Sequence, residues 1–334
     1  MSLPSLPVFY TPRMVVDSGS FSPSASKPAQ VVESWRALRI PLDIVAPKPV
    51  SVEQLRLAHD EAFVWGILAG RIANGLGSCS SAVAASLPYT SGAMLDAARE
   101  AHRNGAVAIA PCSGFHHARW NAAAGFCTFN GLVVTAQALK TDGEVQRVAI
   151  LDFDQHYGDG TDDIILRLQL DYIEHYTAGQ DWGSPHEAQH FLAAIPAIMR
   201  PMADCDVILY QAGADPHIHD PHGGWLTTDE LFERDRIVFE TARAMRVPIA
   251  WNLAGGYQYP LRKVLDIHDN TLRACWQVFG IHSSSEKGSG VFSCPPSRQG
   301  RRIPRTEKTP DPFLAPTPFL ALTGLHRARP ARTA

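Results

Sequence analysis

The chain has 334 residues, 45% of them hydrophobic and 19% charged, a balance typical of a soluble globular protein with one large or two small domains. No apolar run reaches the roughly 18–20 residues that cross a bilayer, and the N-terminus lacks the pattern of a secretory signal, so we expect no membrane partner. Residues 281–334 contain nine Lys/Arg and three Asp/Glu, a net charge of +6. The formal net charge of the whole chain is −3, so residues 1–280 carry −9. An acidic body offers no broad basic face, so we expect no nucleic-acid partner.

The six cysteines are scattered and form no CxxC pair, so we expect reduced thiols in a cytoplasmic protein. Residues 281–334 are rich in Pro, Ser and Arg and lack a sustained hydrophobic period. This composition predicts a mostly disordered tail, and residues 1–280 are interpreted as one catalytic domain. The pattern does not fix the oligomeric state, so a homo-oligomer stays open.

Short apolar runs along the chain are typical of parallel strands that are buried on both faces. They lie at 8–12, 42–47, 106–111, 148–154, 206–213 and 248–256. Between them, Ser51 and Thr227 each begin a capping box that predicts a helix start. Residues 82–104 are interpreted as a helix interrupted near Pro88, and residues 229–246 as an amphipathic helix. Strands that alternate with helices predict an α/β fold with a parallel sheet.

Polar side chains follow several of these apolar runs, where a strand would end and a loop begin. In open α/β sheets, ligands bind outside the carboxyl ends of the strands. Asp154 and His156 are two residues apart after one run, and Asp215 follows a Gly-Ala turn after another. Two carboxylates and one imidazole make an open three-ligand site that suits catalytic zinc and also accepts Fe(II). Taken alone, Asp152 and Asp154 could instead cap the following turn.

The adjacent His116 and His117 follow the run at 106–111. A metal-dependent hydrolase that cleaves an amide needs a base for the attacking water and an acid for the leaving amine. Histidine suits both roles near neutral pH when a carboxylate orients its ring, and Asp152 and Asp159 are available as partners. Tyr257 follows a pair of glycines and could donate a hydrogen bond to a developing oxyanion.

These segments together make the chain resemble the zinc-dependent histone deacetylase family, which includes acetylpolyamine amidohydrolases and acetoin-utilisation proteins. The resemblance covers roughly residues 8–275 and rests on the motifs SGFHHA, GFCTFN, LDFDQHYGDGT, QAGADPHIHDPHGGWLT and LAGGY. It implies an arginase/deacetylase-like three-layer α/β/α fold with a central eight-stranded parallel sheet. It also implies hydrolysis of an acyl group from acyl-lysine or an acetylpolyamine by metal-activated water.

The resemblance implies a role for each matching residue. Asp154, His156 and Asp215 match the zinc ligands. His117 matches the general base and acid, and Asp159 matches its partner; His116 matches the second histidine, and Asp152 matches the partner of that residue. Tyr257 matches the tyrosine that polarises the carbonyl, and Gly125 and Phe126 match one wall of the substrate channel. A K⁺ ion near Asp152 is a further family feature that sequence cannot test.

The chain also departs from the family pattern. Tyr157 stands where many members have a second histidine, and Ala254 stands where many have a glycine. His222 occupies a rim position that is often Leu or Met, and we interpret it as a residue of the substrate channel that disfavours cationic polyamines when protonated. The alternative is a loop histidine that faces solvent. The loop at 18–32 is expected to form part of the rim, with Lys27 exposed to solvent. Two rival functions are a binuclear manganese ureohydrolase, for which a second ligand set is missing, and a catalytically silent binding or scaffold protein.

Overall fold

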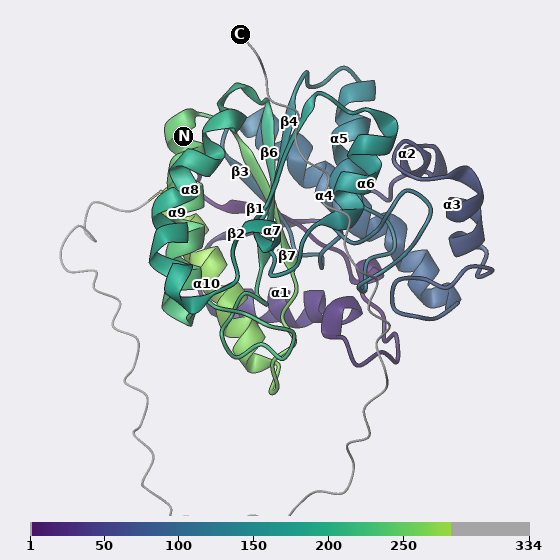
Figure 1. Cartoon of the computed structure of the whole chain (residues 1–334), viewed down its shortest axis with the longest axis horizontal. Helices are drawn as coiled ribbons and strands as arrows, with labels where there is room; N and C mark the ends of the chain where they lie inside the picture. The colour runs from purple at the N-terminus through teal and green to yellow at the C-terminus, as the bar shows by residue number, and fades with distance from the viewer. Residues whose placement is uncertain (1, 282–334) are drawn as a thin grey trace, which may run out of the picture. The chain divides into compact units, whose positions relative to one another are not determined.

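The computed structural model of the chain describes residues 2–281 (Figure 1). The tail predicted at 281–334 falls, apart from its first residue, outside the described residues, and so does Cys294. The other five cysteines are free thiols. Within the described range, none of the helices combines the length and the apolar character that a bilayer crossing requires.

A single seven-stranded parallel sheet forms the centre of the described fold. Its order is β2-β1-β3-β7-β6-β4-β5, and all of its pairs are parallel. The strands are β1 (Leu6–Phe9), β2 (Leu42–Val45), β3 (Val107–Ala110), β4 (Val148–Asp152), β5 (Ile173–Thr177), β6 (Val207–Gly213) and β7 (Ile249–Ala254). Every residue of β3, β4, β6 and β7 is buried, as expected for strands that are covered on both faces.

The expectation of eight strands is wrong for the described residues, which contain seven. All six predicted apolar runs correspond to strands, and β5 is the strand of the described residues that the sequence did not predict. After β5 the chain continues into the short helix α7 (Ala178–Asp181) and then α8 (Ala188–Met199), which leads into β6. The regular structure between β5 and β6 is entirely helical, so this segment adds no strand to the edge of the sheet beyond β5.

Helices cover both faces of the sheet and give the three-layer α/β/α architecture that the sequence predicted. In Figure 1, one layer lies mainly to the left of the strands and the other to the right. The first contains α1 (Lys27–Ala37), α8, α9 (Thr228–Met245) and α10 (Arg262–Phe279), and the second contains α4 (Ser81–Asn104), α5 (Gly131–Thr141) and α6 (Asp159–Leu168). The shorter α2 (Val52–Arg56) and α3 (Glu61–Leu68) lie outside the second layer.

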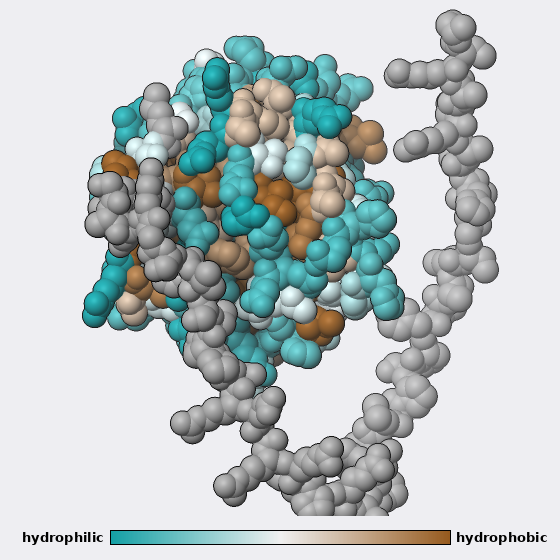
Figure 2. Space-filling view, turned by 90° about the vertical axis from the view of Figure 1, so that its left-hand side faces the viewer, coloured by the Kyte–Doolittle hydropathy of each residue, from teal (hydrophilic) through white to brown (hydrophobic). Residues whose placement is uncertain are grey.

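Each layer encloses its own hydrophobic core against one face of the sheet. Trp35, Phe239 and Trp251 belong to the core beneath α1, α9 and α10, whereas Leu132 and Ile150 belong to the core beneath α4 and α5. Figure 2 shows the outside of the first layer, which is largely hydrophilic, with a group of apolar side chains near the centre and smaller apolar spots at the edges. Such burial on both sides fixes the strands and therefore the loops at their ends.

The helix boundaries follow local signals. Ser51 and Thr227 begin α2 and α9 with complete capping boxes, so both predicted starts are confirmed. The predicted interruption near Pro88 is wrong, because α4 runs through it without a break. Proline removes one helical hydrogen bond, but both halves of α4 contribute buried residues to the protein interior, and this packing outweighs the local cost.

Candidate metal centre and catalytic pocket

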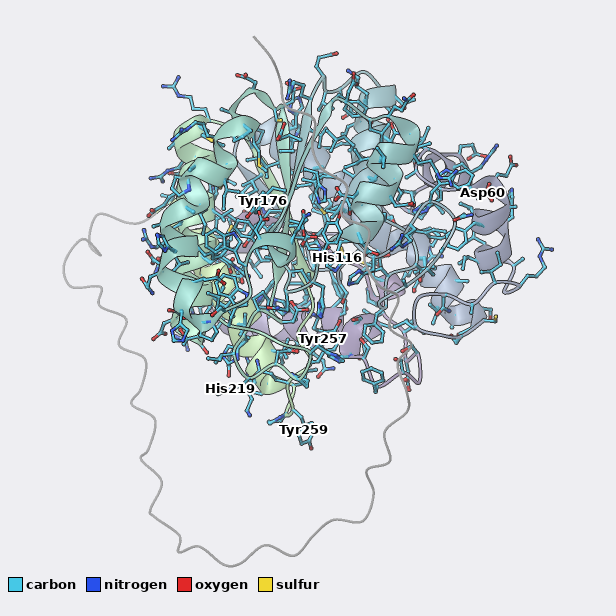
Figure 3. The ribbon with its side chains drawn as sticks, viewed as in Figure 1. Asp60, His116, Tyr176, His219, Tyr257 and Tyr259 are labelled. Carbon is cyan, nitrogen blue, oxygen red and sulfur yellow. The ribbon has the colours of Figure 1, made fainter. Side chains whose placement is uncertain are left out.

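The candidate site lies at the carboxyl ends of four strands. His116 and His117 follow β3, Asp154 and His156 follow β4, Asp215 follows β6, and Tyr257 follows β7. In Figure 3, His116 lies near the centre of the view with Tyr257 below it, and His219 and Tyr259 lie farther out. The topology therefore gathers side chains from distant parts of the sequence, as the doubly wound arrangement predicts.

Asp154, His156 and Asp215 converge on one point. One ligand atom from each lies within 4.8 Å of the other two. His156 Nδ1 is 3.1 Å from Asp154 Oδ1 and 3.2 Å from Asp215 Oδ2. Both carboxylates are buried, and Asp215 Oδ2 has no well-aligned hydrogen-bond donor among the described residues. A buried carboxylate oxygen that lacks a well-aligned donor is costly unless a positive charge, such as the His156 imidazolium or a metal ion, lies beside it.

Two glycines make room for this cluster. A Cβ atom at Gly255 would stand 2.1 Å from Asp215 Cγ, and the backbone there has a φ of +46°. A Cβ at Gly213 would stand 2.5 Å from Asp154 Cα. Both positions therefore require glycine. Ala254, the departure from the family pattern, is the last residue of β7 and keeps an extended backbone, so it fits without strain.

The pKa values of the cluster reflect its crowded negative charge. Burial, followed by the charge of Asp154, raises the pKa of Asp215 to about 7. Hydrogen bonds to Asp154 and then Asp215 raise the pKa of His156 to about 11. The imidazole proton thus balances charge that a divalent cation would balance at the same place. The buried donor set of two carboxylates and one imidazole fits such a cation.

Each of the two adjacent histidines has its own aspartate. His116 Nδ1 is 2.7 Å from Asp152 Oδ2, and His117 Nδ1 is 2.7 Å from Asp159 Oδ1. The two rings lie 4.0 Å apart between centroids. His116 is almost fully buried, whereas the side chain of His117 is 20% exposed and borders the pocket. The two imidazoles therefore share a location but not an environment.

The two histidines also differ in pKa. Burial lowers the pKa of His116, but Asp152 and Asp154 outweigh it and raise the value to about 9. Burial, and then the charge of His116, lower the pKa of His117. At neutral pH without a bound metal, His116 is thus an imidazolium and His117 is neutral. A neutral imidazole can accept a proton, and an imidazolium stabilises nearby negative charge.

A cavity of about 190 Å³ leads to these groups. It is lined by Ser24, Gly114, His116, His117, Gly125, Phe126, Cys127, Asp154, His156, His222, Gly255 and Tyr257. Gly125 and Phe126 both have positive φ, of 52° and 63°, and a Cβ at Gly125 would stand 2.3 Å from His117 Cδ2. This turn brings the Phe126 ring to 5.6 Å from the Tyr257 ring and forms one wall.

The sequence analysis missed Gln211 and Asp220. Gln211 Oε1 accepts from the backbone of Phe115, and its Nε2 donates to Asp152 Oδ1 at 2.9 Å, so it links the histidine loop to Asp152. Asp220 Oδ2 accepts from the Tyr257 backbone at 2.7 Å. Gln211 stands in an otherwise apolar buried strand, and that exception is the signal that could have identified it.

Lys27 was expected to be exposed, and this prediction is wrong. Its side chain is completely buried, and its ammonium donates a hydrogen bond to the carbonyl of Gly255. Lys27, Val31 and Trp35 succeed one another at intervals of four residues and lie on the buried face of α1. This helical spacing could have revealed the burial.

Tyr157, the other departure from the family pattern, lies away from the metal cluster. Its hydroxyl donates to Asp162, which also binds His175 Nδ1 at 2.7 Å. Tyr157 is 37% exposed and does not line the cavity. Its replacement of a histidine thus leaves the three candidate ligands in place.

Comparison with known proteins matches these features to one family. The model of the histone deacetylase domain family matches residues 24–170 and 171–272. An uncharacterized protein of Picosynechococcus sp. is 27% identical over 194 residues, which cover 52% of this chain and 63% of that protein. The acetoin utilization protein AcuC of Staphylococcus aureus is 32% identical over 136 residues, covering 32% of this chain and 35% of that protein. The chain spans less than two thirds of the length of either relative.

Solved structures share the fold at low identity. An acetylpolyamine aminohydrolase from Burkholderia pseudomallei superposes with a TM-score of 0.63 and 18% identity, covering 82% of this chain and 99% of that one. The HD domain of HDA15 gives a TM-score of 0.65 and 15% identity, covering 83% of this chain and 91% of that one. Because the family model matches well over half of the residues, the chain belongs to the histone deacetylase domain family.

Proposed function

We propose that this chain is a metal-dependent amidohydrolase that removes an acetyl or other acyl group from an acylated amine. The observation that carries the proposal is the juxtaposition of a three-ligand cluster, two His–Asp pairs and Tyr257 around one cavity. Hydrolysis of an amide needs an electrophilic centre, a base, an acid and an oxyanion donor. This pocket offers a candidate for each.

Zn²⁺ is the cation that we propose for Asp154, His156 and Asp215, with Fe(II) as the alternative for the same donors. When bound, it would supply a Lewis acid that polarises the amide carbonyl and lowers the pKa of the attacking water. A K⁺ ion next to Asp152 stays a prediction.

The proton transfers are assigned to His117. Its lowered pKa leaves the ring neutral and able to accept a proton from the attacking water. Asp159 holds Nδ1, so Nε2 is the nitrogen that accepts. The same proton then passes to the amine as the C–N bond breaks. His116 lies beside the reacting atoms, where Asp152 raises its pKa, and we assign it to the stabilisation of the negative charge that develops there.

Tyr257 is assigned to the carbonyl oxygen. Burial, and then the charges of Asp215 and Asp154, raise the pKa of its phenol, so the proton stays on the oxygen and is available for donation. The Asp220 carboxylate holds the backbone of Tyr257 at 2.7 Å. A hydrogen bond that strengthens as the oxyanion forms is worth about 100-fold or more in kcat.

The substrate is proposed to be a linear acylated amine, because Gly125 and Phe126 line a small cavity. Two similar proteins are named for polyamine substrates: the rat polyamine deacetylase HDAC10, which is 28% identical over 161 residues and matches 39% of this chain and 27% of its own, and the Burkholderia enzyme. Acyl-lysine and acetylpolyamines are therefore both candidate substrates.

The test is turnover of a panel by protein loaded with a defined metal. The panel contains acetyl-lysine and trifluoroacetyl-lysine peptides, acetylputrescine and acetylspermidine. Tyr257→Phe is expected to lower kcat at least ~100-fold through loss of one oxyanion donor. Tyr259→Phe is the matched control, because Tyr259 is 91% exposed only two residues away, and it is expected to retain full activity.

His117→Ala separates the enzyme from a silent binder. The proposal predicts loss of turnover with an unchanged melting temperature and one bound metal per chain. If the wild-type protein is folded, binds one metal ion and hydrolyses no member of the panel, the catalytic proposal fails. A binding or scaffold protein is then the favoured interpretation. Turnover that both Tyr257→Phe and His117→Ala retain would place the chemistry elsewhere.

A further inference from the structure

A large apolar side chain stands in solvent beside the cavity. Phe21 is 78% exposed, although burying a phenylalanine side chain is worth about 2–3 kcal/mol. It belongs to the segment 15–22, which links two short 3₁₀ turns. Its neighbours along the chain are serine and proline. Exposed apolar groups next to a pocket are candidate ligand contacts.

The segment that carries Phe21 is fastened to the wall of the pocket. The backbone N–H of Val16 donates to the carbonyl of Ala25 at 3.1 Å and closes the loop. The hydroxyl of Ser113 donates to the carbonyl of Ser24 at 2.6 Å. Ser24 itself lines the cavity. Phe21 is therefore held three residues from the pocket wall by bonds to the segment that follows β3.

The ring of Phe21 contacts two residues that line the cavity. It lies 5.3 Å from the Phe126 ring in an edge-on arrangement and 6.1 Å from the His222 ring. His222 in turn lies 4.6 Å from Tyr257. We name Phe21, Phe126 and His222 the aromatic rim. Its three members come from three different loops, and Phe21 extends the apolar wall outward beyond the cavity.

Carboxylates are scarce where a substrate would pass the aromatic rim and enter the cavity. Among the residues that line the cavity, Asp154 is the only carboxylate, and it belongs to the metal cluster. Asp220 is close by, but its two oxygens accept from the backbone of His222 and Tyr257 and it is buried. Asp17 on the segment of Phe21 is an exposed carboxylate, but it does not line the cavity. A second ammonium group on the substrate would thus lose hydration against aromatic rings and a histidine, and cation–π attraction at an exposed site returns only about 0.5–1 kcal/mol.

We propose that Phe21 is a specificity-determining residue that packs on the alkyl stem of the acylated amine outside the cavity. The inference rests on the proposed function and deepens it. It selects substrates with an uncharged alkyl stem, such as an acyl-lysine side chain, over acylpolyamines with an ammonium in the stem. Because Phe21 is remote from the reacting atoms, its contact acts equally on bound substrate and transition state, and so acts on KM.

The experiment compares Phe21→Ala with the wild-type protein on N-acetylethylamine and N-acetylhexylamine, which differ only in stem length. For the hexyl substrate, KM is expected to rise about 10-fold with kcat unchanged, because about two methylene groups lose their contact with Phe21 and return to water. For the ethyl substrate, kcat/KM is expected to stay within twofold. Phe21→Leu keeps an apolar side chain and should recover most of the loss. Leu166→Ala, which removes an exposed leucine from α6, is the matched control.

A second comparison uses an acetyl-lysine peptide and acetylspermidine. The wild-type protein is expected to favour the peptide at least 10-fold in kcat/KM, and Phe21→Ala is expected to reduce this preference. An equal effect of Phe21→Ala on ethyl and hexyl substrates, or a wild-type preference for acetylspermidine, would overturn the inference while leaving the proposed function intact. Absence of wild-type turnover on every substrate would overturn both.

Discussion

At the scale of single residues, the two histidines of the pocket differ also in the neighbours of their aspartates. Asp152 Oδ1 accepts from neutral groups, the amide of Gln211 and the backbone of Asp154. Asp159 is instead shared with a cation, since Arg119 donates to its second oxygen. A carboxylate that is paired with a guanidinium attracts a proton on its histidine less strongly. Arg119 therefore helps to keep His117 neutral.

Arg119→Met is expected to raise the pKa of His117 and shift the acidic limb of the kcat/KM profile to higher pH. The base acts in its neutral form, so activity at pH 6.5 should fall several-fold and recover by pH 8. The measurement is kcat/KM against pH from 6 to 9, with Arg119→Lys as the conservative control. An equal loss at every pH would mean that Arg119 serves only to position Asp159.

Lys27→Met tests the buried ammonium below the pocket. Burial lowers the pKa of Lys27 to about 8, against the charges of Asp215, Asp154 and Asp220, so the group is mostly charged at pH 7. The substitution leaves the Gly255 carbonyl without its donor, which costs about 1–3 kcal/mol in the free energy of unfolding. Urea unfolding measures this cost. Lys48→Met, in which an exposed lysine is replaced, should change the stability by less than about 0.5 kcal/mol.

At the scale of elements, the sequence predicted what depends on local pattern. The buried strands β3, β4, β6 and β7 were recognisable because burial on both faces leaves continuous apolar runs. β5 was missed because Glu174 and His175 interrupt its pattern at the edge of the sheet. The family residues of the site could be named from motifs, whereas for Gln211 and Lys27 the sequence signals burial but not the contacts that each side chain makes. Their partners are distant in sequence, and only the folded chain brings them together.

The loop between β3 and α5 carries both histidines, and His59 fastens it from the side. His59 Nδ1 lies 2.9 Å from the carbonyl of Arg119, and its Nε2 accepts from the backbone N–H of Asn130 at 2.8 Å. Nδ1 must therefore carry the proton, and Nε2 must be free of one. A second proton on Nε2 would break the bond to Asn130, so His59 has to stay neutral for the loop to stay anchored.

His59 is expected to make the fold sensitive to acid. Burial lowers its pKa from 6.5 to about 4, against hydrogen bonds to the backbone of Arg119 and Trp120. Between pH 6.5 and 4 the unfolded chain binds a proton that the folded chain does not, so the free energy of unfolding decreases as the pH falls. The full effect is on the order of 3 kcal/mol. Urea unfolding at several pH values should show this slope in the wild-type protein and less of it in His59→Gln.

His186→Gln is the control for this effect, because His186 is exposed and should leave the acid slope unchanged. The outcome that contradicts the argument is an identical slope in the wild-type protein and in His59→Gln. In that case other buried groups near the cavity, such as the carboxylates of Asp215 and Asp154, would dominate the acid response.

At the scale of the whole molecule, the two ends of the described fold meet. The backbone N–H of Leu3 donates to the carbonyl of Phe279, and the N–H of Ile281 donates to the carbonyl of Leu3 at 3.0 Å. These bonds include the last described residue. A chain that ends at residue 283 is thus expected to keep the melting temperature and kcat/KM of the full chain, whereas one that ends at residue 278 should melt lower. Thermal unfolding of the two truncated chains tests the domain boundary that we predicted near residue 280.

A metal ion at the candidate centre would also act on the whole molecule, because the three candidate ligands come from loops after β4 and β6. Without a metal ion, Asp154 and Asp215 lie close together in a buried place, with the His156 imidazolium as their nearest counter-charge. At a free Zn²⁺ concentration of 100 times Kd, binding adds about 2.7 kcal/mol to the free energy of unfolding. Metal-depleted protein should therefore gain on the order of 5 °C in melting temperature when one equivalent of Zn²⁺ is added.

Asp215→Asn should abolish this gain, whereas Asp171→Asn, which changes an exposed aspartate, should retain it. The melting temperature of metal-depleted Asp215→Asn should equal or exceed that of the metal-depleted wild-type protein, because the substitution removes one of two crowded buried charges. A loss of stability in both states would show instead that Asp215 mainly supports the fold. A gain with Zn²⁺ that survives Asp215→Asn would place the bound ion at other ligands, and the hydrolytic proposal would lose its electrophilic centre.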